Sequence, residues 1–272
     1  MNILLLKLTV TPIVIAIATL AARRYGPVVG GWLIGLPVTA GPVTVFLNAS
    51  HGPAFASRTA AGVVGGVTAQ GLFVLGFAAA MRTGRGWRFG IAVASVVFLA
   101  SAFAMRALGL DTLAFAVLAV VTLLVGIKLV RADGAGVRVA PPKWDLPLRM
   151  ALATALVVTV TAAASSLGPV LSGVLTTYPI LSTLLAVFAF RNGGLAPALS
   201  VYRGLLLGLF ALESFALTAS LLLGHVSSAV TFAAAFGAAF GCQAVTLIAV
   251  QASRRRIAAA ERRAALASAR LI

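Results

Sequence analysis

Apolar runs of about 20 residues recur along this chain from end to end. A helix of that length crosses the ~30 Å hydrocarbon core of a bilayer. Of the 272 residues, 61% are hydrophobic and 10% are charged, whereas about 25% of a soluble domain is charged. Only helices and closed barrels satisfy their backbone in lipid, and these runs lack the alternation of barrel strands. The sequence therefore predicts an all-α fold, a polytopic transmembrane helical bundle.

We expect about nine spans, separated by short polar or charged gaps. They are residues 3–22, 28–47, 59–81, 89–105, 112–130, 148–164, 170–190, 198–223 and 226–250. The first run also has features of a secretory signal peptide, because it is N-terminal and has small residues near its end. Its charges, Arg23 and Arg24, follow the apolar core instead of preceding it. We therefore interpret this run as a retained helix.

One stretch occurs twice in the chain. Residues 26–66 align with residues 168–208 without a gap, at a constant offset of 142 residues. The identities include Gly31/Gly173, Pro37/Pro179, Gly62/Gly204 and Gly66/Gly208. Most are Gly and Pro, which fix the path of the backbone. The offset contains five spans, an odd number, so the copies would cross the membrane in opposite senses. Such inverted-topology repeats are typical of secondary transporters, and some channels share them.

The repeat predicts four parts of the chain. Residues 1–130 hold the first repeat and a connector span, 131–145 a cytoplasmic linker, 146–250 the second repeat, and 251–272 a basic cytoplasmic tail. The tail is rich in alanine and carries six arginines. It fits two interpretations: an amphipathic helix on anionic lipid, or an anchor that sets the topology.

The net charge of +16 carries topology information, because the cations lie in short gaps between apolar runs. With the N-terminus outside and the C-terminus in the cytoplasm, 18 cations fall inside and three fall outside: Lys7, Arg58 and Arg106. This is a strong positive-inside bias. The excess of arginine over lysine fits a GC-rich bacterial genome, so we expect a multi-pass protein of the bacterial cytoplasmic (inner) membrane. The expected partners are the lipid bilayer and a small-molecule or ion substrate, with no nucleic acid; the oligomeric state stays open.

Prolines interrupt the second and seventh spans at equivalent positions. Residues 36–42 read LPVTAGP, and residues 176–183 read TTYPILST. Unwound backbone at membrane depth coordinates ions or carboxylates through its freed amides, its carbonyls and half-helix ends. The alternative is a proline kink repaired by Thr and Ser hydroxyls. The candidate binding residues are Pro37, Thr39, Gly41, Thr44, Thr176, Thr177, Tyr178, Pro179, Ser182 and Glu213.

Glu213 is the only acid deep in a predicted span. Such groups usually face the bundle interior and mark pathways or pairs. The functional interpretation is a proton or cation carrier. The alternatives are an ion pair with Lys7, which shares its leaflet, and a glutamic acid that stays protonated against a backbone carbonyl. Other membrane-embedded polar groups, Gln70, Gln243 and Thr246, predict interhelical hydrogen bonds. The Gly62-x3-Gly66 and Gly204-x3-Gly208 pairs predict close helix approach.

The chain lacks the residue sets that enzymes and metal sites need. It has five acids, and its two histidines, His51 and His225, lie in gaps between runs. No nucleophile–base set, HExxH or phosphate-cradling glycine loop occurs. The single cysteine, Cys242, belongs to no zinc-ligand spacing. We therefore expect no enzyme activity, no cofactor and no metal.

Residues 36–47, LPVTAGPVTVFL, resemble uncharacterised bacterial polytopic inner-membrane proteins. The broken crossing helices are similar in plan to inverted-repeat transporter folds, a resemblance that implies architecture and transfers no residue. Three functions follow as hypotheses. The first is a secondary transporter for a small polar or anionic solute, with a midplane site between the broken helices. The second is a channel or passive permease on the same fold. The third is a membrane component that acts through a partner and its basic tail.

Overall fold

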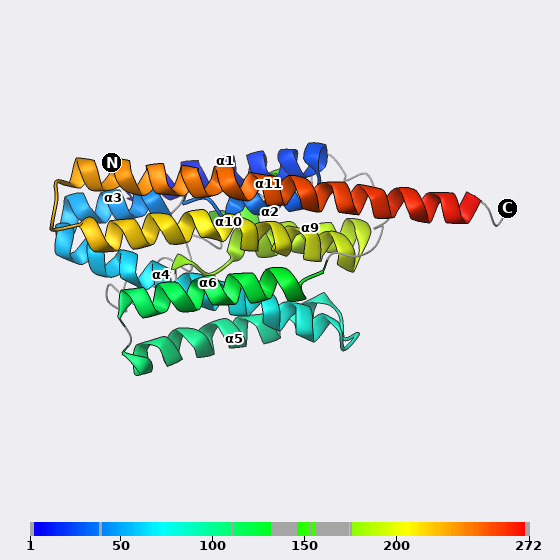
Figure 1. The fold of residues 1–272 in the computed structure, drawn as a ribbon, viewed down its shortest axis with the longest axis horizontal. Coiled ribbons are helices and arrows are strands. Elements are labelled where there is room, and N and C mark those ends of the chain that lie inside the picture. Colours follow the sequence, from blue (N-terminus) through cyan, green and yellow to red (C-terminus); the bar gives the residue numbers. More distant parts are fainter. Residues whose placement is uncertain are drawn as a thin grey trace.

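Helices run side by side along the long axis of the molecule in the computed structural model (Figure 1). The structure describes residues 3–37, 40–109, 111–131, 146–148, 150–152, 154–155, 174 and 176–269. The helices are α1 (Ile3–Tyr25), α2 (Pro27–Ile34), α3 (Ala40–His51), α4 (Pro53–Met81), α5 (Trp87–Leu108), α6 (Thr112–Leu129), α9 (Ile180–Gly193), α10 (Leu195–Leu222) and α11 (Ser228–Ala269). Successive helices from α4 to α6 and from α9 to α11 point in opposite directions (Figure 1).

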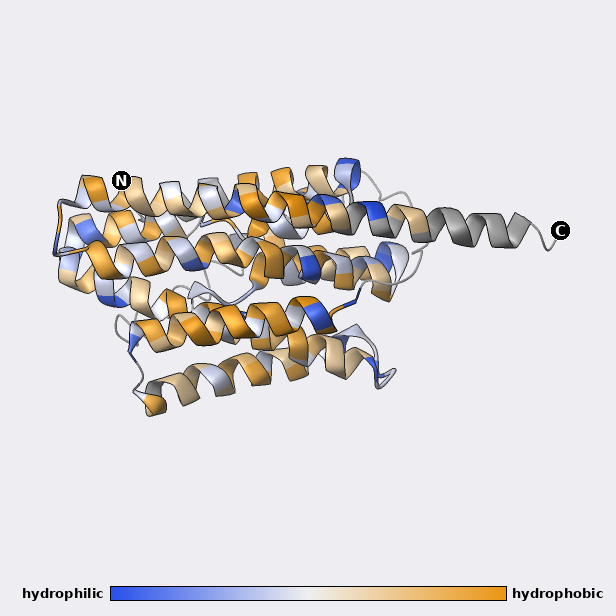
Figure 2. Cartoon of the chain, in the orientation of Figure 1, coloured by the Kyte–Doolittle hydropathy of each residue, from blue (hydrophilic) through white to orange (hydrophobic). Residues whose placement is uncertain are grey.

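Within the described part of the chain, five helices are long and apolar enough to cross a membrane: α4, α5, α6, α10 and the Ser228–Ala252 part of α11. The all-helical fold class is therefore confirmed for the described part of the chain. Apolar residues cover the length of these helices, and polar residues gather towards their ends (Figure 2). Large apolar side chains are exposed on the outer helices, as at Val117 of α6 and Ile248 of α11. Lipid is the natural cover for such a surface.

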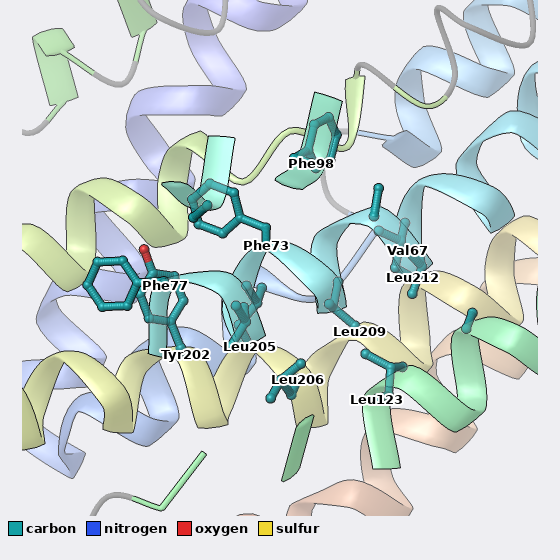
Figure 3. Close-up of a cluster of buried hydrophobic side chains, with 14 of the residues drawn as sticks. Val67, Phe73, Phe77, Phe98, Leu123, Tyr202, Leu205, Leu206, Leu209 and Leu212 are labelled. Carbon is teal, nitrogen blue, oxygen red and sulfur yellow. The ribbon is translucent and has the colours of Figure 1, made fainter. Parts of the chain in front are cut away.

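The centre of the bundle is the contact between α4 and α10. Phe73 and Phe77 of α4 lie against Tyr202 of α10, with ring centroids 6.1 Å and 4.8 Å apart. Leu205 and Leu209 continue this packing along α10, with Leu123 of α6 beside them (Figure 3). These side chains are almost fully buried. Each contributes about 1.5–3 kcal/mol where it leaves water, but inside a membrane close packing takes over that role.

Helices that lie 142 residues apart have corresponding neighbours. At this offset α3 corresponds to α9, α4 to α10, and α5 to the first part of α11. The pairs α3–α4 and α4–α5 pack together, and so do α9–α10 and α10–α11. α6 has no separate helix as its counterpart, since the offset places it on the last part of α11, and it packs against both α4 and α10.

The predicted run 28–47 is interrupted as expected, and the final run ends later than expected. The run 28–47 is two helices, because α2 ends at Ile34 and α3 begins at Ala40, a gap that overlaps the predicted break at residues 36–42. The final run does not end at Val250, since α11 continues as one helix to Ala269 and includes most of the predicted tail. Most of the predicted sixth span and of the 131–145 linker lies outside the described residues, as does the start of the seventh span.

Candidate functional site

Four glycines bring α2 and α10 into backbone contact. A Cβ added to Gly31 would lie 2.8 Å from the carbonyl carbon of Val201. Likewise, a Cβ added to Gly204 would lie 2.8 Å from the carbonyl carbon of Val28. One turn further along, a Cβ on Gly35 would lie 2.5 Å from Gly208 Cα. The predicted close approach at Gly204-x3-Gly208 is therefore present, and its partner is a second small-residue pair at the same spacing on α2.

The same contact recurs with the halves of the chain exchanged. Gly66 of α4 lies against Thr177, where an added Cβ would come 2.8 Å from Thr177 Cγ2. Thr177 corresponds to Gly35 at the offset of 142 residues, and Gly208 corresponds to Gly66. The Gly35–Gly208 contact and the Thr177–Gly66 contact are therefore reciprocal.

The first break lies between α2 and α3. The amides of Gly35 and Leu36 donate to the carbonyls three residues before them, at 3.2 and 3.3 Å, which tightens the last turn of α2. Pro37 is buried and its carbonyl accepts from the Gly41 amide at 2.9 Å. Gly41 itself lies against the Phe236 ring of α11, 2.9 Å from an added Cβ to Cζ. Thr39, another predicted site residue, lies outside the described residues.

The second break lies just before α9. Tyr178 and Pro179 are not helical, and α9 begins at Ile180. The Pro179 carbonyl accepts from the Thr183 amide at 2.9 Å. The Tyr178 hydroxyl shares a 2.6 Å hydrogen bond with Ser95 of α5. Its ring meets Phe73 and Phe98 edge-on, with centroids 5.8 and 5.2 Å away.

Three of the candidate hydroxyls bond to carbonyls of their own segments. Thr44 donates to Ala40 O at 2.8 Å. Thr177 donates to Val174 O at 2.6 Å, and Ser182 donates to Pro179 O at 3.1 Å. All three side chains are buried, and Thr176 is half-buried. In this conformation each hydroxyl donates its proton to a backbone carbonyl, as the kink interpretation expects. Only the lone pairs of the hydroxyl oxygens remain to accept a hydrogen bond from a ligand.

The two breaks lie near each other. Ile34, at the end of α2, packs against the cluster that contains Leu181, at the start of α9. One turn away, Gly30 lies against Leu185, with 3.0 Å from an added Cβ to Cδ2. The helix ends that flank Pro37 and Pro179 therefore lie near each other.

The end of α2 is held by two side chains of α11. Gln243 Nε2 donates to the Trp32 carbonyl at 3.1 Å, and Trp32 Nε1 donates to Thr246 Oγ1 at 3.0 Å. The predicted interhelical hydrogen bonds of Gln243 and Thr246 are therefore confirmed. Gln243 is buried, and its Oε1 has no hydrogen-bond partner. Trp32 was not predicted as part of this region, although it is the indole nearest to the break in the sequence.

Glu213 of α10 is buried. Its side chain is 4% exposed, and neither carboxyl oxygen has a hydrogen-bond partner among the described residues. It lies seven residues, or about two turns, from Leu206, whose side chain packs at Gly126 of α6. The face of α10 that carries Glu213 is therefore the face towards α6. The Lys7 side chain lies outside the described residues, so the ion pair with Lys7 stays a prediction; α1 itself packs against α2 and α9.

The described residues contain no group of three or more His, Cys, Asp or Glu that could hold a metal ion. No family model matches the chain, and no curated protein or solved structure matches it. The fold therefore assigns the chain to a structural class of proteins and not to a protein family. The chain is an all-helical protein with several helices able to cross a membrane, consistent with a multi-pass membrane protein.

Proposed function

We propose that the chain is an integral membrane transport protein, a secondary transporter for a small polar or anionic solute. The observation that carries this proposal is the reciprocal pair of contacts, Gly35–Gly208 and Thr177–Gly66. Contacts that recur with the halves exchanged are expected when two repeats are related by a two-fold axis. α4 and α10, which correspond at the repeat offset, also run in opposite directions (Figure 1). Both features support an inverted-topology repeat.

The distribution of cations supports the predicted topology, with nine spans, the N-terminus outside and the C-terminus in the cytoplasm. α1, α4, α6 and α9 end at the end of the bundle towards which α11 runs (Figure 1). Cations follow or close these helices at Arg23, Arg82, Lys128 and Arg191. A cluster of cations on one side is the usual mark of the cytoplasmic face.

The solute would bind beside the two breaks. α3 and α9 both begin there, and helix N-termini carry partial positive charge and free amides that favour anions. The end of α2 and the unpaired Gln243 Oε1 add acceptors for a donor group of the same solute. Rocking of one repeat against the other would expose this site to each side in turn.

Transport is tested with the full-length protein in proteoliposomes. Currents on a solid-supported membrane would be recorded after concentration jumps of acetate, lactate, phosphate, nitrate and glutamate. Concentrative uptake that a proton uncoupler abolishes supports the proposal. Flux that only follows the gradient favours the channel or passive permease, and no flux with any probe counts against transport of these solutes.

A matched pair of variants locates the site. Gly41→Leu forces a side chain against the Phe236 ring beside the first break, where an added Cβ would already lie 2.9 Å from Cζ, so it should abolish flux. Gly237→Leu places the same side chain on an exposed part of α11 where an added Cβ meets nothing within 4 Å, so flux should persist. Equal flux in both variants would remove the first break from the pathway.

A further inference from the structure

We propose that Glu213 forms a proton-binding site of its own, in the groove where α10 packs against α4 and α6. Its carboxylate takes up a proton to become a neutral acid, and it releases that proton again while the protein stays folded. This proposal rests on the proposed transport function, because the proton bound at Glu213 would be the ion that drives transport. The site is separate from the solute site beside the breaks.

Structural roles explain Glu213 poorly. A carboxylate without a partner is costly to bury, and a neutral carboxyl without a partner still loses its hydrogen bonds with water. Among the described side chains Glu213 has no hydrogen-bond partner, although it is 4% exposed. A leucine would pack at this position without either cost. An ionisable group at membrane depth that is costly to bury in both its protonated and its ionised form is typical of residues that carry protons or ions.

The groove around Glu213 is apolar. Leu209 and Leu206 lie about one and two turns before Glu213 on α10, and they share a cluster with Val67 of α4 (Figure 3). The same cluster includes Ala119 of α6. The 142-residue counterpart of Glu213 is Gly71 of α4, which lies against Thr122 of α6, 2.7 Å from an added Cβ to Cγ2. α6 therefore covers the same repeat position in both halves. The first repeat has a glycine at this position and the second repeat has a carboxyl group. A movement of α6 would therefore expose a titratable group to water in the second repeat only.

The described charged groups on the helices that pack against α10 are exposed or have partners of their own. Arg58 of α4, Lys128 of α6 and Arg191 of α9 are exposed. Asp111 caps the start of α6 by accepting from the Ala114 amide. α2 and the Ser228–Ala252 part of α11 contain no charged residue. On α10 itself, Arg203 donates to Ile127 O at 2.6 Å and Val130 O at 3.0 Å, about 15 Å along the axis from Glu213.

Two tyrosine hydroxyls are also titratable, and each has a partner of its own. Tyr202, on α10, pairs with Thr183 at 3.5 Å, and Tyr178 pairs with Ser95. Neither hydroxyl reaches the Glu213 carboxyl, whose two oxygens have no partner. The described side chains provide no fixed counter-ion for Glu213. Burial and access to water therefore set its protonation state.

Infrared spectroscopy tests the proposal without a known solute. Full-length protein in lipid would be titrated with pH, and the carbonyl stretch of protonated carboxylic acids would be followed. Glu213→Gln keeps the shape of the side chain and removes the acid, and Glu261→Gln in the tail is the matched control. We expect a band at neutral pH that disappears reversibly as the pH rises, is lost in Glu213→Gln and is kept in Glu261→Gln.

Two results would overturn the proposal. A band that persists at every pH at which the protein stays folded would identify a permanently protonated, structural acid. Absence of a Glu213-dependent band at neutral pH would identify a carboxylate that stays ionised. Either result leaves the proposed transport function standing with another driving ion, so the two failures are distinguishable. Should Glu213→Gln fold poorly, Glu213→Leu gives the same comparison, because an apolar side chain suits the groove.

Discussion

Gly35 of α2 lies directly on Gly208 of α10, with no side chain between the two backbones. The contact joins a residue of the first repeated stretch to a residue of the second, and the Thr177–Gly66 contact mirrors it. Each contact sits beside one of the two breaks. The packing of the broken segments therefore depends on the smallest residues of the chain.

Gly35→Ala should destabilise the protein. The added methyl meets the Gly208 backbone, which cannot rotate away, and overpacking of this kind costs about 1–3 kcal/mol. The conformation of Gly35 is ordinary for alanine, with φ −70°, so the cost would come from contact alone. Thermal unfolding in detergent measures it. Gly237→Ala is the control, because its Cβ meets nothing; equal melting temperatures in the two variants would contradict the close crossing.

Gly66→Ala should be destabilising in the same way, and Thr177→Ala should relieve it. The new methyl of Gly66→Ala would meet the Thr177 side chain, which Thr177→Ala removes. Residues in direct contact show coupling energies of about 0.5–3 kcal/mol in double-mutant cycles. The cycle also subtracts the loss of the Thr177–Val174 hydrogen bond. Strict additivity of the two changes would show that the residues do not touch.

Thr246→Val should loosen the end of α2. The change removes the acceptor of the Trp32 indole N–H, and the loss of one such bond costs about 0.5–1.5 kcal/mol. The emission of Trp32 should also shift, measured with Trp87 and Trp144 replaced by phenylalanine. Thr218→Val serves as the control, since that hydroxyl donates to Ser214 O of its own helix at 2.7 Å. An emission change of the same size in the control would count against the Trp32–Thr246 bond.

Reporter fusions test the proposed topology. Fusions after residue 136 and at the C-terminus should both report cytoplasm, because the cations gather at that side. A fluorescent protein reports the cytoplasmic side, and alkaline phosphatase reports the outer side. Phosphatase activity from either fusion would overturn both the topology and the inverted repeat.

Local chemistry made the breaks predictable, because proline removes a donor wherever it stands in a helix. Pro37 and Pro179 could therefore be placed from the sequence, and so could the close approach at Gly204 and Gly208. The partners of these residues could not be placed. That Gly208 meets Gly35, and that Trp32 bonds to Thr246, depends on how the helices cross. The depth of Glu213 follows from counting residues, but the helix that it faces follows only from packing.

α11 is one helix of 42 residues, of which the first 25 form the apolar segment Ser228–Ala252. The remaining 17 residues continue the same helix for about 26 Å at 1.5 Å per residue, and the end of this helix projects past the rest of the bundle (Figure 1). A straight helix of this kind works as a lever, and any tilt of its apolar part would sweep the far end through a wide arc.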